Sequence, residues 1–172
     1  MEHLKYPIGK FEHGKIYSTE EDQKHISEIE AFPSQLLPLA HSLRSDQLEK
    51  SYRPGGWTAK QIIHHLADSH INAYIRTKLA LTETSPTIKP YGQDLWANLP
   101  DGKNLNMEVS LSLTEGIHQR WSYLLRSLEE KDFQKKYIHP EYNREFKLSE
   151  LLALYAWHGR QHLAHLNIIK AS

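Results

Sequence analysis

Apolar residues recur at three- and four-residue steps in four stretches of the chain, a spacing typical of amphipathic helices. The stretches cover about 18–43, 58–81, 107–129 and 149–169. Each is roughly 20 residues long, which suits the helices of a bundle. The pattern therefore predicts an all-α fold, a four-helix bundle.

Helix starts are marked by residues that can satisfy free backbone N–H groups. Residues 18–21 (STEE) and 58–61 (TAKQ) both fit a capping box. Ser149 fits a cap for the last helix. Pro33 and Pro38 fall inside the first helix, where each removes a donor and crowds the preceding turn, so we expect a kink or a break there.

The connections are uneven in length. Residues up to about 17 are expected to form an extended arm, and a long crossover reaches Asn106 with one short helical turn around Trp96. Residues 135–148 predict a small β-hairpin before the last helix, with Pro-Glu-Tyr-Asn as its turn. We predict one domain over residues 1–172.

Two helices show which of their faces should be buried. In the second helix the apolar face is defined by Ile62, Ile63, Leu66 and Ala73. In the third helix a stripe is formed by Val109, Leu113, Ile117, Trp121, Leu124 and Leu128. Both stripes are expected to face the core.

Charge and composition exclude several classes of protein. Lys plus Arg and Asp plus Glu number 21 each in 172 residues, without the basic excess typical of a nucleic-acid binder. The absence of cysteine excludes disulfides, thiolate metal sites and a cysteine nucleophile. The start of the chain lacks the apolar core of a signal peptide, and no stretch is long enough for a membrane span. We expect a cytoplasmic protein that binds neither membranes nor nucleic acid.

Histidine is concentrated in two short windows. Six of the 12 histidines lie in "IIHHLADSH" and "WHGRQHLAH". Neutral imidazole is the commonest metal ligand in proteins. Two clusters so far apart in sequence predict a metal site only if the fold brings the two helices together.

Helix geometry separates candidate ligands from their neighbours. His158 and His162 are four residues apart, so both lie on one helix face. His65 falls at the edge of the apolar face of its helix, where a side chain can reach a cavity. A polar seam continues from it through Ser69, Asn72 and Arg76. We interpret His65, His158 and His162 as metal ligands.

The other histidines are expected to have ordinary roles. His64 falls opposite the apolar face and should be solvated, whereas His70 should be a hydrogen-bonded core residue. His165 suits a place in the core or behind the ligands. Surface or packing roles are expected for His3, His13, His25, His41, His118 and His139.

Three common catalytic or phosphate-binding motifs are absent. A zinc peptidase helix has Glu directly after its first histidine, but here Gly159 and Arg160 follow His158. The chain also has no Gly-rich phosphate loop and no Gly-x-Ser-x-Gly elbow. Catalytic residues stay unassigned; Asp68 and Arg160 are candidates for contacts with a ligand histidine or substrate.

Several segments resemble the DinB/YfiT-like superfamily, most of all its YfiT branch of metal-dependent hydrolases. The resemblance rests on "GGWTAKQIIHHLADSH", "AYIRTKLALTE", "LYAWHGRQHLAHL" and the amino-terminal "YPIGKFE". It implies a four-helix bundle with long crossovers, a homodimer, and one divalent metal per subunit, zinc in the first place with nickel as the alternative. The family's three ligand histidines fall on His65, His158 and His162.

Three histidines leave a tetrahedral ion with one open position, as in catalytic zinc sites. We therefore expect an enzyme that hydrolyses a small molecule through metal-bound water. The first alternative is a metal-dependent S-transferase, similar to bacillithiol transferases, that joins a low-molecular-weight thiol to an electrophile. The second is a non-catalytic metal-binding protein.

Overall fold

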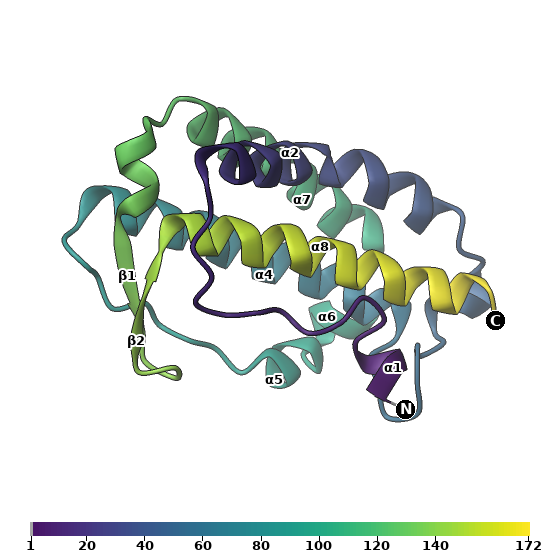
Figure 1. Cartoon of the computed structure of the whole chain (residues 1–172). Helices are drawn as coiled ribbons and strands as arrows, with labels where there is room; N and C mark the ends of the chain where they lie inside the picture. Colours follow the sequence, from purple (N-terminus) through teal and green to yellow (C-terminus); the bar gives the residue numbers. More distant parts are fainter. Residues whose placement is uncertain (1) are drawn as a thin grey trace.

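Four long helices form a bundle in the computed structural model, which describes residues 2–172. They are α2 (Thr19–His41), α4 (Ala59–Thr82), α7 (Met107–Arg126) and α8 (Leu148–Lys170). Helices α2 and α4 each pack against both α7 and α8 (Figure 1). The predicted four-helix bundle is confirmed.

Short elements fill the connections between the long helices. They are α1 (Glu2–Lys5), α3 (Ser45–Leu48), α5 (Gln93–Ala97), α6 (Pro100–Asn104) and the 3₁₀ helix η1 (Glu130–Gln134). Helix α5 is the turn predicted around Trp96, whereas α6 was not predicted. The arm expected over about 1–17 is helical at its start, and Met1 lies outside the described residues.

The predicted hairpin closes one end of the bundle. Strands β1 (Lys136–His139) and β2 (Arg144–Lys147) pair antiparallel, with Tyr137 opposite Phe146. These two rings stack with their centroids 5.5 Å apart and are buried in the core. Asn143 takes the left-handed conformation (φ 48°) that the tight turn requires.

Both predicted capping boxes form, but the cap of the last helix lies elsewhere. Helix α8 begins at Leu148, with Lys147 at its N-cap. Ser149 instead donates a hydrogen bond of 2.5 Å to Oδ1 of the buried Asp22. Ser149 therefore joins α8 to α2, a contact that helix-start rules cannot predict.

The break expected at the prolines does not occur, because α2 runs through both Pro33 and Pro38. Pro33 has no N–H to give to the carbonyl of Ile29, four residues earlier. The Nδ1–H of His118 on α7 takes that place, 2.6 Å from the Ile29 oxygen. A tertiary hydrogen bond thus replaces the one that proline removes.

The apolar stripe predicted for the third helix is partly wrong. Val109 and Leu113 are 53% and 43% exposed. The buried face of α7 instead comprises Ser110, Leu111, Thr114, His118, Trp121, Ser122 and Leu125. Most of the buried polar groups on this face are hydrogen-bonded; Trp121 Nε1, for example, donates to Thr77 Oγ1 at 3.0 Å, whereas Thr114 Oγ1 has no partner among the described residues.

The amino-terminal segment runs along α8 and then crosses it to reach α2 (Figure 1). Its backbone is held by side chains of α8: Trp157 Nε1 donates to the Gly9 carbonyl at 3.1 Å, and Gln161 Nε2 donates to the Lys5 carbonyl at 2.7 Å. The segment is therefore part of the wall beside α8. Within residues 2–172, no helix is long and apolar enough to cross a membrane.

Helices α2 and α8 are in tight contact at Gly159. A Cβ atom built at this position would lie 2.8 Å from a ring carbon of Phe32. The Phe32 ring is itself packed against the rings of His70 and His118, with centroids 5.1 and 5.2 Å apart. Glycine is therefore required here by space, and a glutamate at this position would not fit.

We expect Gly159→Ala to lower the free energy of unfolding by about 1–3 kcal/mol, because the added methyl group overpacks the contact with Phe32. Gly116→Ala is the matched control, since nothing lies within 4 Å of its added Cβ. In an exposed helix that change should stabilise by up to about 1 kcal/mol. Urea unfolding of both variants measures the difference; equal stabilisation of the two would contradict the tight contact.

Candidate metal centre

Three histidines from two helices meet between α4 and α8. His65, His158 and His162 each offer one ring nitrogen, and the three nitrogens lie within 4.8 Å of one another. His65 Nε2 and His158 Nε2 are 3.1 Å apart. Ligands of a tetrahedral zinc ion at 2.0–2.1 Å are about 3.3 Å apart. The donor set therefore fits a single ion such as zinc.

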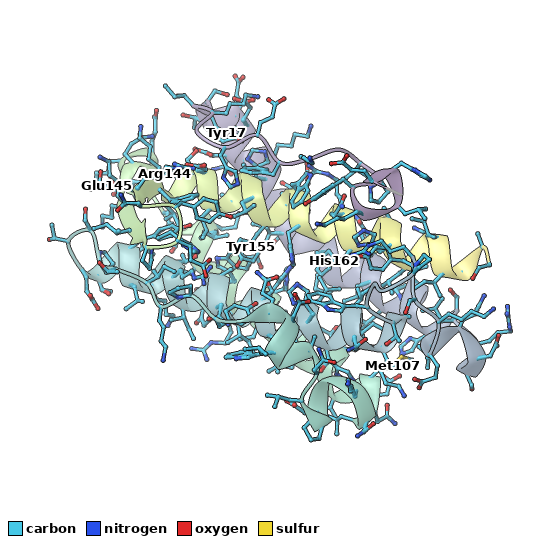
Figure 2. All side chains as sticks on the ribbon, turned by 90° about the horizontal axis from the view of Figure 1, so that it is seen from below. Tyr17, Met107, Arg144, Glu145, Tyr155 and His162 are labelled. Carbon is cyan, nitrogen blue, oxygen red and sulfur yellow. The ribbon has the colours of Figure 1, made fainter. Side chains whose placement is uncertain are left out.

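Packing of the bundle orients the three rings. His158 and His162 are one turn apart on α8, and Figure 2 shows His162 further along that helix than Tyr155. Trp57, in the turn before α4, covers the cluster from one side. Its ring centroid is 4.5 Å from that of His65, and it stacks on His162 at 6.3 Å.

One chain of hydrogen bonds ends at His158. The Ile29 carbonyl can only accept, so His118 donates to it from Nδ1 and keeps a free lone pair on Nε2. That Nε2 lies 2.6 Å from His70 Nδ1, and His70 Nε2 lies 3.1 Å from His158 Nδ1. When the rings are neutral, the Nδ1–H of His70 donates to His118 Nε2, and the Nδ1–H of His158 donates to His70 Nε2. His158 is then left with its Nε2 lone pair facing the cluster.

A second, shorter chain ends at His162. His165 donates from Nε2 to the Lys5 carbonyl of the amino-terminal segment at 3.1 Å. Its Nδ1 lies 3.3 Å from His162 Nδ1, which therefore donates to it when both rings are neutral. The lone pair of His162 is thus on Nε2, the form that a metal ligand requires.

The surroundings keep these rings neutral. Burial, followed by the neighbouring histidines, lowers the pKa of His65 and His162 well below the usual value. Burial is also the main cause that lowers the pKa of His158 to about 4, and the neighbouring His165 adds to it. Because a metal binds the neutral imidazole, the arrangement favours binding without the loss of a proton from the rings.

A cavity of about 580 Å³ opens beside the cluster. His158 and His162 form part of its wall, and aromatic rings and the amino-terminal segment form much of the rest. This volume is in the range of sites for small molecules. A metal held by the three histidines would therefore lie next to space for a substrate.

The candidates Asp68 and Arg160 lie away from this cavity. Arg160 is exposed and pairs with Glu28 of α2. Burial, and then the charge of Asp101, raise the pKa of Asp68 to about 6, but Asp68 does not line the cavity. Neither residue is placed to touch a substrate there.

The prediction for His64 is wrong, whereas those for His70 and His165 are confirmed. His64 is only 4% exposed, because the crossover before α7 covers it. Its ring nitrogens lie 2.7 Å from Ser110 Oγ and 3.1 Å from the Leu105 carbonyl. Helix phase could not reveal this cover, since it comes from another part of the chain.

Sequence reasoning gave His118 no role near the site. The signal that could have pointed to it is Pro33, which leaves the Ile29 carbonyl without its helical partner. The identity of the new partner depends on how α7 packs against α2. Only the fold therefore shows that His118 belongs to the chain behind His158.

Comparisons with known proteins agree with this arrangement. The family model of the DinB superfamily matches residues 28–166. Proteins of Bacillus cereus (strain 03BB102) and Bacillus mycoides (strain KBAB4), each named "Putative metal-dependent hydrolase", are 48% identical to this chain over 170 residues. These alignments cover 99% of this chain and 97% of each relative.

Two solved structures are similar. YfiT from Bacillus subtilis, described as "a probable metal-dependent hydrolase with an unusual four-helix bundle topology", matches with a TM-score of 0.94 and 40% identity, over 98% of this chain and 97% of YfiT. A mycothiol-dependent maleylpyruvate isomerase matches with a TM-score of 0.68 and 19% identity, over 84% of this chain and 60% of the isomerase. The second match concerns the fold alone.

Acid should destabilise the protein through His118. Burial lowers the pKa of His118 from 6.5 to about 4, although the bond to Ile29 partly opposes this. The unfolded chain therefore binds a proton below about pH 6.5 that the folded chain binds only near pH 4. As the pH is lowered from about 6.5 to about 4, the protonation of this one histidine should lower the free energy of unfolding by about 1.4 kcal/mol per pH unit. Urea unfolding of His118→Gln should show a shallower slope than the wild type; an equal slope would contradict the prediction.

Proposed function

This chain belongs to the DinB superfamily, and on that premise we propose that it is a metal-dependent hydrolase of a small molecule, with His65, His158 and His162 as ligands of one divalent ion. The observation that carries the proposal is the convergence of three ring nitrogens beside a cavity. The names of close relatives support metal dependence. We propose zinc as the metal, with nickel as the alternative, since nitrogen ligands suit both.

When bound, a divalent ion supplies Lewis acidity and lowers the pKa of a water molecule that it holds. The chain's own contribution is to hold three neutral donors and to limit access of solvent. His65 and His162 are buried, and Trp57 and the amino-terminal segment enclose the cluster. The wall of aromatic rings suits the apolar part of a small substrate.

Transfer of a low-molecular-weight thiol to an electrophile is the second candidate. Among the described residues that line the cavity, the sole carboxylate is that of Glu141, which is exposed. Hydrolysis commonly uses a general base, whereas a thiol that is already deprotonated needs none. A mycothiol-dependent isomerase has a similar fold, which is compatible with this second candidate.

Other expectations stay predictions. These are the single domain, the homodimer, the cytoplasmic location and the absence of nucleic-acid binding. A non-catalytic metal-binding protein is the remaining alternative, and it is separated from the two enzymes by the assay below.

Metal binding and turnover test the proposal together. We expect untagged protein to bind about one zinc ion per chain, and His65→Ala, His158→Ala or His162→Ala to lose it, because two imidazoles cannot complete the site. Elemental analysis and zinc titration give the metal content. His41→Ala is the matched control, since His41 is exposed and pairs with Glu108.

Ester and amide panels should then be hydrolysed by the zinc-loaded wild type without added thiol, and not by His158→Ala. Turnover of electrophiles only with a small thiol would replace the hydrolase with the transferase. Binding of one ion without turnover of either kind would leave the non-catalytic alternative. Full metal content in the three alanine variants would refute the ligand set.

A further inference from the structure

Arg76 is a buried cation without a partner in the wall of the cavity. It lies on α4, is 8% exposed, and lines the same cavity as His158 and His162. Among residues 2–172, no hydrogen bond or ion pair is found for the side chain of Arg76, and its guanidinium nitrogens are not among the fully enclosed polar atoms, so they reach the space of the cavity. Arginine is rarely buried unless it is paired. The guanidinium therefore faces the cavity with its donors free, and a ligand that places an anion there would gain charge-assisted hydrogen bonds.

The groups around Arg76 are also suited to an anion. Burial, followed by the charge of Arg76, lowers the pKa of His139, whose Nδ1 is buried without a hydrogen-bond partner among the described residues. Ser69 and Tyr155 line the same cavity and carry hydroxyl groups that can donate. The carboxylate of Glu150 is bound elsewhere, since it accepts from Arg144 at 3.0 Å and from the Gly14 N–H at 3.0 Å.

Arg76 and His65 lie at different positions along the axis of α4. Arg76 follows His65 by eleven residues on α4, which is about 16 Å along the helix axis. Both belong to the polar seam of that helix, and the cavity runs beside it. A molecule with its reacting bond at the histidines could therefore extend toward Arg76.

We propose that the substrate carries an oxyanion, a carboxylate or a phosphate, which Arg76 binds at the end of the cavity away from the three histidines. The planar guanidinium presents paired N–H donors that match either group in a two-point contact. This proposal rests on the proposed function, because it names the class of molecule that the site takes. Lys5, an exposed residue that also lines the cavity, adds positive charge that would attract the same anions.

Binding of simple anions to the metal-free protein tests this proposal apart from the reaction. We expect succinate and inorganic phosphate to raise the melting temperature and to bind in calorimetry, whereas neutral succinamide does not. Arg76→Met should weaken anion binding about tenfold or more. The variant should melt at the same temperature as the wild type without anion, or higher, because it loses an unpaired buried charge.

Three further proteins make the result decisive. Arg120→Gln, an exposed arginine on α7, should bind the anions as the wild type does. Arg76→Lys keeps the charge but loses the two-point contact, so it should bind with intermediate affinity. His158→Ala should retain anion binding even where it has lost metal and turnover, which separates failure of the hydrolase proposal from failure of this one. Equal anion binding by Arg76→Met and the wild type, or loss of binding in His158→Ala, would overturn the proposal.

A different observation supports a second inference. The two hydrogen-bond chains that end at His158 and His162 both begin at backbone carbonyls, those of Ile29 and Lys5. A carbonyl cannot donate, so it fixes the direction of every hydrogen bond in a chain of neutral rings. We infer that His118 is a positioning residue that, through His70, holds His158 with its lone pair on Nε2. The proline at position 33 makes this possible, because it leaves the Ile29 carbonyl available.

Two substitutions of His118 separate positioning from packing. His118→Gln can still donate to Ile29 and accept from His70, whereas His118→Phe keeps a ring but can do neither. We expect His118→Phe to weaken zinc binding about 10–100-fold and His118→Gln to restore most of the affinity. Zinc competition titrations give the dissociation constants.

Nitrogen-15 NMR of the metal-free protein gives a readout that does not depend on metal or turnover. The imidazole shifts should show His118, His70 and His158 with the proton on Nδ1 in the wild type and in His118→Gln. In His118→Phe the tautomers of His70 and His158 should become mixed. Unchanged tautomers and unchanged zinc affinity in folded His118→Phe would overturn the inference; loss of both in His118→Gln as well would also contradict it.

Discussion

The structure depends on one constraint: an imidazole buried between helices must have a partner for its N–H. Five histidines meet this constraint by bonding to one another and to backbone carbonyls in two chains, which lead to His158 and His162; these two meet His65 between α4 and α8. Each chain starts at a backbone carbonyl and ends at the Nε2 lone pair of a candidate metal ligand. A buried polar network of this kind is stable only when it is complete.

This constraint connects the candidate site to distant parts of the chain. The carbonyl behind His158 belongs to α2 and is free because of Pro33, and the carbonyl behind His162 belongs to the amino-terminal segment. The same segment also borders the cavity. Support for His162 and enclosure of the cavity therefore come from the same piece of backbone. Gly159 packs closely on Phe32, whose ring also contacts His70 and His118 of the first chain.

The polar seam of α4 links the metal centre to the proposed anion site. His65 and Arg76 lie on this seam and are both buried. The two side chains differ in what they can bind: burial favours a neutral imidazole at His65 that can bind a metal, whereas the guanidinium of Arg76 has no anionic partner among residues 2–172. A molecule with an anionic group could pair with Arg76 while its other end lies at the three histidines.

Periodicity and local capping rules were sufficient for the four helices, the hairpin and both capping boxes, because these depend on residues close in sequence. Spacing also selected His65, His158 and His162, the three histidines that converge. Tertiary structure decided what helix phase could not: that His64 is covered, that the exposed side of α7 includes Val109, and that α2 continues through its prolines. Each of these outcomes depends on a partner from another helix or connection, and such partners become neighbours only when the chain has folded.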